Sequence, residues 1–418
     1  MKDSRKSLQG PASPLYRVSS FVRQFARALI AGVAVATLWV NLAPASYYDA
    51  IEFRLLDLSL GPLDVTITPL SLVSDGLMAL FLFFIGKELW EAVVLERGAL
   101  AGRAKASMPL GAVIGGLGGA AAAWLIFSAL FVRAEEADFL TGWTVPLGSD
   151  VILCYAMGRV VFGRGHPALH LLLLITIAFD ILGLLITGLT NPQAVIRPLW
   201  LLLPAVTVAV TWAGFGRLAR SDATERQHRR AHALWPYLIA GALTWIGVAL
   251  SGLPATLGLL PLIPVIPHAE RSFGLFAEAE AYLTDPLNRM THLMVRPLPW
   301  ILFLFGLTRG GVDIAAFAPT TGSVLVALWL GKPLGIIAGA LIAGGITGSL
   351  LPRDLALADL GLIALIAGMG FTVPVLAVGV ALPGGELAEA ARLGLAISLC
   401  AGPIALLVAR LSGQKRQN

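Results

Sequence analysis

The residues best suited to chemistry in this sequence are acids and bases inside long apolar segments. Residues 171–189 read LLLLITIAFDILGLLITGL, with Asp180 as the single charged residue. A stretch of this length and composition is typical of a membrane-spanning helix. An ionised Asp at the centre of such a helix costs about 2.5–3.5 kcal/mol on insertion scales. We therefore expect Asp180 to hold a proton or a cation, or to pair with a base.

Three other ionisable residues fall well inside apolar segments: Asp150, Arg309 and Lys332. Lys332, in WLGKPLG, is the expected charge partner of Asp180, and Pro333 weakens the helix beside it. Asp150 ends the motif TVPLGSD, where its carboxylate either binds ions beside freed backbone groups or caps the second half-helix. We expect Lys332 to face Asp180 and Asp150 to line a cavity open to the cytoplasm. Arg309 is expected either to reach toward the space beside Ile181 or to pair with Asp180 or Asp150.

Two acids in the second apolar segment are further candidates for a funnel or a response to pH. Asp75 lies near the start of this segment, where it either caps the helix or lines a water-filled funnel. Glu88 and Lys87 lie near its other end, and we expect both to extend their charged groups to the membrane surface.

The composition indicates a polytopic membrane protein. Of 418 residues, 57% are hydrophobic and 13% charged, and the mean hydropathy is +0.81, whereas a soluble domain carries about 25% charged residues. The net charge of +5 does not indicate nucleic-acid binding, because the bases lie between apolar segments. Cys154 and Cys400 are interpreted as small buried hydrophobic residues, and GLGG at 116–119 as a helix-packing stretch. No signal peptide, catalytic triad, metal-spaced cluster or phosphate loop stands out, so we expect neither an enzyme nor a cofactor.

Twelve apolar segments of near-spanning length must position these residues. We predict helices over 26–46, 70–93, 108–132, 143–162, 168–190, 199–216, 235–251, 254–268, 294–311, 321–343, 357–382 and 389–409. Residues 53–67, FRLLDLSLGPLDVTI, alternate in polarity around Gly61-Pro62, which predicts a small β-hairpin. The chain 1–418 is then one integral membrane domain, with a cytoplasmic segment 1–25 and a cytoplasmic tail 412–418.

The basic residues alternate between the two sides of the membrane, which sets the predicted orientation. The N-terminal segment, the second, fourth and sixth connections and the C-terminal GQKRQN are basic, whereas VRAEEADF at 132–139 is acidic. The bases of those connections are Arg97, Arg103, Lys105, Arg164, Arg217, Arg220, Arg226, Arg229 and Arg230. Both termini are therefore predicted to be cytoplasmic.

Two segments contain helix breakers at mid-depth. The fourth has Pro146 and Gly148 in TVPLGSD, and the eleventh has Gly368 and Gly370 in GMGFTVP, which also contains Thr372. Such breaks are tolerated where the freed backbone groups line a cavity or meet a neighbour. Each is the second helix of a triplet, and the two triplets enter the membrane from opposite sides. We therefore predict inverted repeats whose broken helices cross at a midplane binding site.

The sequence resembles the NhaA family of sodium/proton antiporters over most of its length. The resemblance rests on SDGLMALFLFFIGKE (74–88), GWTVPLGSD (142–150), GKPLGI (331–336) and GMGFT (368–372). It implies that the broken helices cross near a hydroxyl–Asp pair, here Ser149–Asp150. It also implies that Asp180 and Lys332 match the family's first helix-five Asp and its helix-ten Lys. The resemblance further implies a secondary transporter of the bacterial inner membrane that exchanges Na⁺ or Li⁺ for H⁺ in pH and sodium homeostasis, with a homodimer formed through the hairpin.

Three positions depart from this family pattern. The second helix-five Asp, the family's principal ion-binding carboxylate, aligns with Ile181, a family Asn aligns with Arg309, and a family His aligns with Pro254. The core then holds two carboxylates and two bases, so a negative pocket becomes formally neutral, and we expect weaker cation binding and altered coupling. Two other functions are compatible with the sequence: a same-fold transporter of another ion or of an organic anion held by Arg309 and Lys332, and a non-transporting homologue.

Overall fold

The computed structural model of the chain describes residues 17–18, 21–60, 63–94, 103–131, 140–163, 165–191, 195–216, 231–267, 277–278, 285–348, 355–382 and 384–412. The bases Arg97 and Arg164 and the five arginines from 217 to 230 lie outside these residues, as do the acidic stretch 132–139 and the tail from 413. The orientation of the chain in the membrane therefore stays a prediction.

The described part of the chain is an assembly of membrane-spanning helices, as predicted. Seven segments are long and apolar enough to cross a bilayer, or up to nine if each of two bent helix pairs counts as one span. The seven are Phe21–Leu42, Pro69–Val94, Ala106–Phe131, Gly142–Phe162, Pro167–Thr190, Pro319–Thr347 and Gly385–Leu411. Three shorter apolar helices, Pro198–Gly214, Trp235–Leu250 and Ala255–Val265, coincide with three of the other five predicted segments, and the two bent pairs coincide with the last two.

The two bent pairs differ in how well the sequence predicts them. Helices α16 (Leu357–Ala367) and α17 (Thr372–Ala381) bend by 49° at the predicted GMGF break. Helices α12 (Pro286–Met294) and α13 (Leu298–Arg309) bend by 56°, and this bend was not predicted. Pro297 lies at this bend and has no N–H to donate into the preceding turn. The predicted ninth segment, 294–311, begins at the last residue of α12 and misses the rest of that helix.

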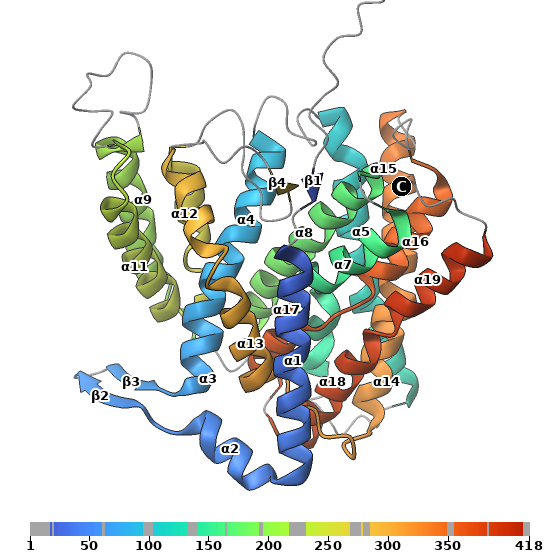
Figure 1. Cartoon of the computed structure of the whole chain (residues 1–418), viewed down its shortest axis with the longest axis horizontal. Helices are drawn as coiled ribbons and strands as arrows, with labels where there is room; N and C mark the ends of the chain where they lie inside the picture. The colour runs from blue at the N-terminus through green and yellow to red at the C-terminus, as the bar shows by residue number, and fades with distance from the viewer. Residues whose placement is uncertain are drawn as a thin grey trace, which may run out of the picture.

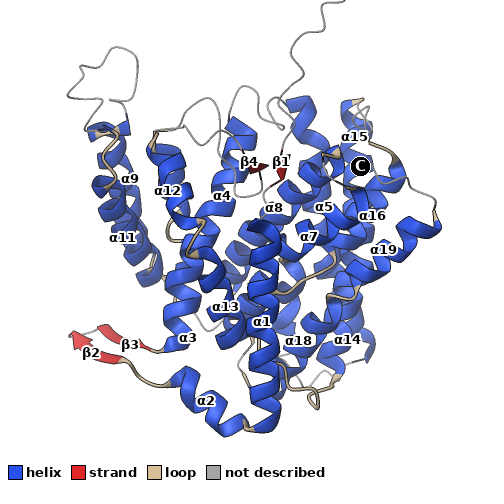
Figure 2. Ribbon diagram, in the orientation of Figure 1, coloured by secondary structure: helices blue, strands red, loops and turns tan. Residues whose placement is uncertain are grey.

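The predicted β-hairpin is present. Strand β2 (Leu56–Leu60) pairs antiparallel with β3 (Leu63–Ile67), with Leu56 opposite Ile67. It follows α1 (Phe21–Leu42) and α2 (Pro44–Glu52), and Figure 1 shows it projecting away from the bundle. A second short pair, β1 (Arg17–Val18) with β4 (Ala277–Glu278), was not predicted. Figure 2 shows how small the strand content is beside the helices.

The outer faces of the helices carry the apolar side chains that a bilayer requires. Large hydrophobic residues remain exposed along them, such as Leu130 at 70%, Val210 at 64% and Ile346 at 81%. A soluble protein rarely exposes so much contiguous apolar surface. These exposed faces fit the predicted polytopic membrane fold.

A seam of glycines joins α5 (Arg103–Phe131) to α15 (Lys332–Thr347). A Cβ atom added at Gly115 would lie 2.1 Å from the carbonyl oxygen of Gly335, and one at Gly339 would lie 2.0 Å from that of Gly111. Only glycine allows two helix backbones to approach this closely. Within the predicted packing stretch 116–119, a Cβ at Gly119 would lie 2.2 Å from the Gly331 carbonyl oxygen, whereas Gly118 has nothing within 4 Å. The seam therefore continues through this stretch to the residue that precedes Lys332.

Candidate functional site

The fourth span is broken where the sequence predicts it. The 3₁₀ turn η2 (Gly142–Leu147) contains Pro146, and Gly148 then continues in an extended conformation. Helix α7 (Val151–Phe162) begins immediately after Asp150, whose Oδ1 accepts a hydrogen bond of 2.8 Å from the Leu153 N–H. Asp150 is therefore the N-cap that satisfies one of the free backbone donors of this half-helix.

The eleventh span breaks at Gly368–Phe371, between α16 and α17, and the break is held by neighbours on two sides. A Cβ atom at Gly368 would lie 2.5 Å from the carbonyl oxygen of Leu328, which precludes any larger residue there. The Gly370 N–H donates to the hydroxyl of Ser398 at 3.1 Å, and this hydroxyl also bonds the Gly370 carbonyl at 3.1 Å. Backbone groups freed by the break are thus paired inside the protein, as membrane depth demands.

The two breaks meet, so the predicted crossing of broken helices is confirmed. The Ser149 hydroxyl donates to the Ala367 carbonyl at 2.8 Å, and the Asp150 N–H donates to the Met369 carbonyl at 2.9 Å. In the other direction, the Thr372 N–H donates to Asp150 Oδ2 at 3.1 Å, and the Thr372 hydroxyl donates to the same oxygen. The end of each broken span therefore supplies partners for the other.

Asp180 approaches this crossing from α8 (Pro167–Thr190) with one oxygen engaged and one free. Its Oδ1 accepts the Ser149 N–H at 2.7 Å, and its side chain is completely buried. Its Oδ2 has no hydrogen-bond partner in the part of the chain that the structure describes. A buried carboxylate oxygen without a partner is costly unless it carries a proton or contacts a cation. Gly183, one turn further along α8, brings that helix against the break, since a Cβ there would lie 2.9 Å from the Gly148 nitrogen.

Lys332 reaches the same crossing from α15, and its side chain is also completely buried. A π-helical turn, η7 (Ala327–Gly331), directly precedes it, and Pro333 follows. Single π-helical turns within α-helices are frequent at functional sites. The Nζ atom donates to the Gly148 carbonyl and to the Ser149 hydroxyl, the latter at 3.3 Å.

Lys332 and Asp180, which we expected to face each other, are connected through a third residue. Both residues bind the Ser149 segment, Lys332 through the hydroxyl and Asp180 through the backbone N–H. Among the described residues, however, no ion pair within 4.0 Å joins them. The structure therefore brings the two charges to one segment without a direct contact.

Arg309, at the end of α13, contacts other elements than the two aspartates. Its Nη2 donates to the Ser74 hydroxyl at 3.1 Å. A Cβ at Gly379 would lie 2.7 Å from its Nη1, so the guanidinium packs against α17. No ion pair within 4.0 Å joins it to Asp150 or Asp180 in the described part of the chain. The expected pairing of Arg309 with Asp150 or Asp180 is therefore wrong, and Lys332 is the base that binds the crossing in the described part of the chain.

The acids of the second span occupy different environments. Asp75 lies inside the π-helical turn η1 (Leu72–Leu77), while Thr68 caps the preceding helix α3 (Pro69–Ser71), so Asp75 is not the cap. Asp75 is half-buried, and its carbonyl accepts the Trp245 Nε1–H at 2.7 Å. It is the residue next to the Ser74 that binds Arg309. A role for Asp75 in a funnel stays a prediction.

The charges at the other end of this span do not extend to the surface. Lys87 and Glu91, on α4 (Met78–Val94), form an ion pair of 2.9 Å, and the Lys87 side chain is 0% exposed. Glu88 is also buried. The expectation of surface-extended side chains is therefore wrong, because a partner one turn away lets the lysine charge remain inside. A response of Glu88 to pH stays a prediction.

Ile181, the residue in the place of a family carboxylate, lies in an apolar contact. Its Cδ1 is 3.6 Å from the position of a Cβ atom at Gly86, and Leu260 and Ile263 meet the same position. Gly86 belongs to α4, and the other two belong to η6 (Leu260–Val265). The side chain therefore fills a contact between three elements and supplies no oxygen to the crossing.

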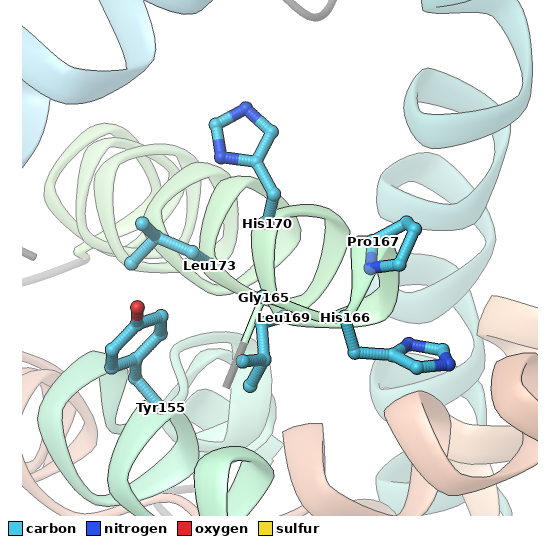
Figure 3. A pocket seen from close by; sticks show the side chains of 7 residues that line it. All are labelled: Tyr155, Gly165, His166, Pro167, Leu169, His170 and Leu173. Atoms are coloured by element: carbon cyan, nitrogen blue, oxygen red, sulfur yellow. The ribbon is translucent and has the colours of Figure 1, made fainter. Parts of the chain in front are cut away.

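One described cavity, of about 200 Å³, lies between α7 and α8. Figure 3 shows Tyr155 from α7 on one side of it and Leu169, His170 and Leu173 from α8 on the other. Asp150 does not line it and is 0% exposed, so the expected open cavity at Asp150 is wrong. The hydroxyl and amide donors of Thr372 and Leu153 provide its polar surroundings instead.

The two cysteines differ. Cys154 is buried, and its Sγ donates to the Ile366 carbonyl at 3.2 Å beside the crossing. Cys400 is exposed, so its expected burial is wrong. Sequence reasoning also missed Phe179, whose ring lies beneath Lys332. Only its position next to Asp180 could have indicated it.

Comparisons with known proteins agree with this architecture. A sequence model of the family "Na+/H+ antiporter 1" matches residues 21–409. The Na(+)/H(+) antiporter NhaA of Jannaschia sp. (strain CCS1) is 38% identical over 96% of this chain and all of its own length. That of Geobacter sulfurreducens is 31% identical over 95% of this chain and 98% of its own.

Among solved structures, the sodium proton antiporter MjNhaP1 from Methanocaldococcus jannaschii is similar in fold. The match has a TM-score of 0.50 and 14% identity, and it covers 94% of this chain and 98% of that one. At this identity the likeness concerns the fold alone. The family match over residues 21–409, together with relatives 38% and 31% identical over nearly their whole lengths, shows that this chain belongs to the NhaA family of Na⁺/H⁺ antiporters.

Proposed function

We propose that this protein is a secondary active transporter that exchanges Na⁺ for protons across a membrane. The observation that carries the proposal is the group of oxygens around the Lys332 ammonium. The Gly148 carbonyl and the Ser149 hydroxyl bind Nζ, and the Asp180 carboxylate binds the backbone of the same segment. Carbonyl, hydroxyl and carboxylate oxygens are the ligands that hard cations prefer.

Competition for these oxygens explains how one site exchanges two ions. A protonated Lys332 occupies the Gly148 and Ser149 oxygens and so excludes a cation from them. When the ammonium withdraws, the same oxygens and the free Oδ2 of Asp180 become available to Na⁺. Asp150 is less available, because Thr372 and Leu153 already hold both of its oxygens. We assign ion and proton binding to Asp180, Ser149 and Lys332, with Asp150 and Thr372 holding the crossing together.

Several finer features belong to the same proposal. We infer that Li⁺ can replace Na⁺, that both termini face the cytoplasm of a bacterium whose inner membrane holds the protein, and that the chain 1–418 acts as one transporter domain. The hairpin β2–β3 projects from the bundle and is available for a homodimer contact (Figure 1). Transport of an organic anion between Arg309 and Lys332 has no support in the geometry, because these bases bind different elements.

Purified protein in proteoliposomes tests the proposal. An imposed Na⁺ gradient should drive proton movement in the opposite direction, and Asp180→Asn should abolish it because the amide neither carries a proton nor attracts a cation. Asp57→Asn is the matched control, since Asp57 is exposed on the hairpin and pairs with Arg54 at 3.0 Å. Proton movement in wild type that does not depend on Na⁺, Li⁺ or K⁺ would show that the protein is not a cation antiporter.

A further inference from the structure

An aromatic ring lies against the buried base of the site. The Lys332 Nζ is 4.9 Å from the centroid of the Phe179 ring and above its face. Phe179 immediately precedes Asp180 on α8, and both it and Lys332 are 0% exposed. The face of an aromatic ring attracts a cation within about 6 Å, and the attraction is strongest where water is excluded.

We propose that Phe179 is a positioning residue for exchange: its ring holds the Lys332 ammonium over the Gly148 and Ser149 oxygens in place of a direct ion pair. This inference rests on the proposed function of the site. An ammonium has three donors, and two of them are used on Gly148 and Ser149. The ring supplies the remaining favourable contact, and Asp180 Oδ2 is left without a partner in the described structure.

The contact has a consequence for the competition between the ammonium and Na⁺. A cation that enters the site must displace the ammonium from the Gly148 and Ser149 oxygens. Because the ring favours the ammonium in that position, it strengthens the state that excludes Na⁺. Weakening the ring's attraction should therefore let Na⁺ bind at lower concentration.

The position of the ring is fixed by α5. A Cβ atom at Gly116 would lie 2.4 Å from Cζ of Phe179, so an alanine there must displace the ring. Tyrosine is not a conservative replacement for Phe179, because its hydroxyl would extend from Cζ towards the same helix.

Fluorinated phenylalanine gives the sharpest test, because fluorine weakens the electrostatic attraction of the ring face and changes its size little. Singly and doubly fluorinated phenylalanine at position 179 should lower the apparent KM for Na⁺ in steps, with a smaller effect on the maximal rate. Phe179→Leu, which removes the ring, should lower KM by about 5- to 30-fold, the range expected for a cation–π contact in a dry site. The same series at Phe81, an equally buried ring on α4, is the control. A KM that does not change along the series at position 179 overturns the proposal.

A stability measurement separates this inference from the proposed function. In purified protein, fluorination at position 179 should lower Tm by about 1–2 °C in wild type and leave Tm unchanged in Lys332→Met. An equal fall in both backgrounds would indicate steric effects alone and would overturn the proposal. If wild type shows no Na⁺-dependent proton movement, the proposed function fails, and this double-mutant cycle still decides whether the ring and the ammonium interact.

Discussion

Lys332 and Arg309 are two bases inside the membrane region, the first within the continuous span Pro319–Thr347 and the second at the end of α13, and neighbouring glycines position both. Lys332 follows Gly331, where an added Cβ would lie 2.4 Å from the Gly119 carbonyl. Arg309 lies between Gly306 and Gly310, and a Cβ at Gly306 would lie 2.6 Å from the Leu29 carbonyl of α1. In both cases glycine brings two backbones together and so fixes where the base emerges.

The two bases differ in what they reach. The ammonium of Lys332 is wholly buried and binds a carbonyl and a hydroxyl where the broken helices cross. Arg309 is half-buried, and its guanidinium binds Ser74 and packs on α17, while its buried Nε has no hydrogen-bond partner among the described residues. A base within an apolar segment is therefore part of an ion site only when its helix directs the side chain to that site. Its position along the apolar segment does not predict this direction.

Replacing each base by methionine tests whether Lys332 and Arg309 differ in their importance for exchange. We expect the largest loss of exchange rate from this pair of variants. Lys332→Met removes the group that competes with Na⁺ and should lower proton-coupled exchange by about 100-fold, the lower end of what a positioned proton-transfer group contributes. Arg309→Met should lower it less than about 10-fold, because only a contact to Ser74 and α17 is lost. Initial rates in proteoliposomes at matched protein content measure both. Equal losses would mean that Arg309 acts at the crossing.

The glycine seams give the next largest effect. Gly335→Ala places a Cβ 2.1 Å from the Gly115 carbonyl and forces α5 and α15 apart, which should destabilise the protein by about 1–3 kcal/mol or more. Gly345→Ala, on the same helix α15, meets nothing within 4 Å and should be neutral or slightly stabilising. Thermal unfolding of the purified variants tests this pair. A Gly335→Ala protein as stable as wild type would show that the seam is looser than the structure has it.

The smallest expected effect is on the voltage dependence of the exchange rate. This dependence reports how many charges move at the crossing in each exchange cycle. With Ile181 in place of a carboxylate and Arg309 elsewhere, we expect exchange close to one proton per Na⁺, whose rate barely responds to voltage. Each net charge moved would contribute about 2.3 kcal/mol per 100 mV. Rates in vesicles clamped at different potentials measure this, with Ile181→Asp expected to add voltage dependence and Ile181→Asn as the uncharged control.

Two outcomes would contradict that expectation. A steep voltage dependence of the wild type would mean that another group carries the second proton. An inactive wild type that gains exchange in Ile181→Asp would mean that the natural chain has lost or changed the activity.

The sequence predicts the breaks well because their cause is local. Proline and glycine interrupt helix hydrogen bonding wherever they occur, so Pro146 and the Gly368–Gly370 pair indicate broken spans without knowledge of their neighbours. The hairpin around Gly61-Pro62 was predictable for the same reason. The bend between α12 and α13 was missed although Pro297 lies at it, because α12 is too polar to extend the apolar segment.

The direction of a side chain is what the sequence could not provide. Lys87 is near the end of an apolar segment, and only the structure shows that an ion pair with Glu91 keeps the charge of Lys87 buried within the protein. Arg309 aligns with a family position, and its partner Ser74 is 235 residues away along the chain. The ring of Phe179 lies beneath Lys332 because α8 and α15 both pack on α5, which is a property of three helices together.

The glycine seam between α5 and α15 also limits where the molecule can move. Two backbones in direct contact have no side chains between them that could repack. We therefore expect α5 and α15 to move as one rigid unit and not to slide past each other. The crossing is the opposite: its bonds join hydroxyls, amides and carboxylates to backbone groups, and such bonds can exchange partners at little net change in free energy. A transporter that must open alternately to two sides would then move its broken half-helices relative to a rigid α5–α15 pair. Lys332, which lies next to the glycine seam, would be displaced the least.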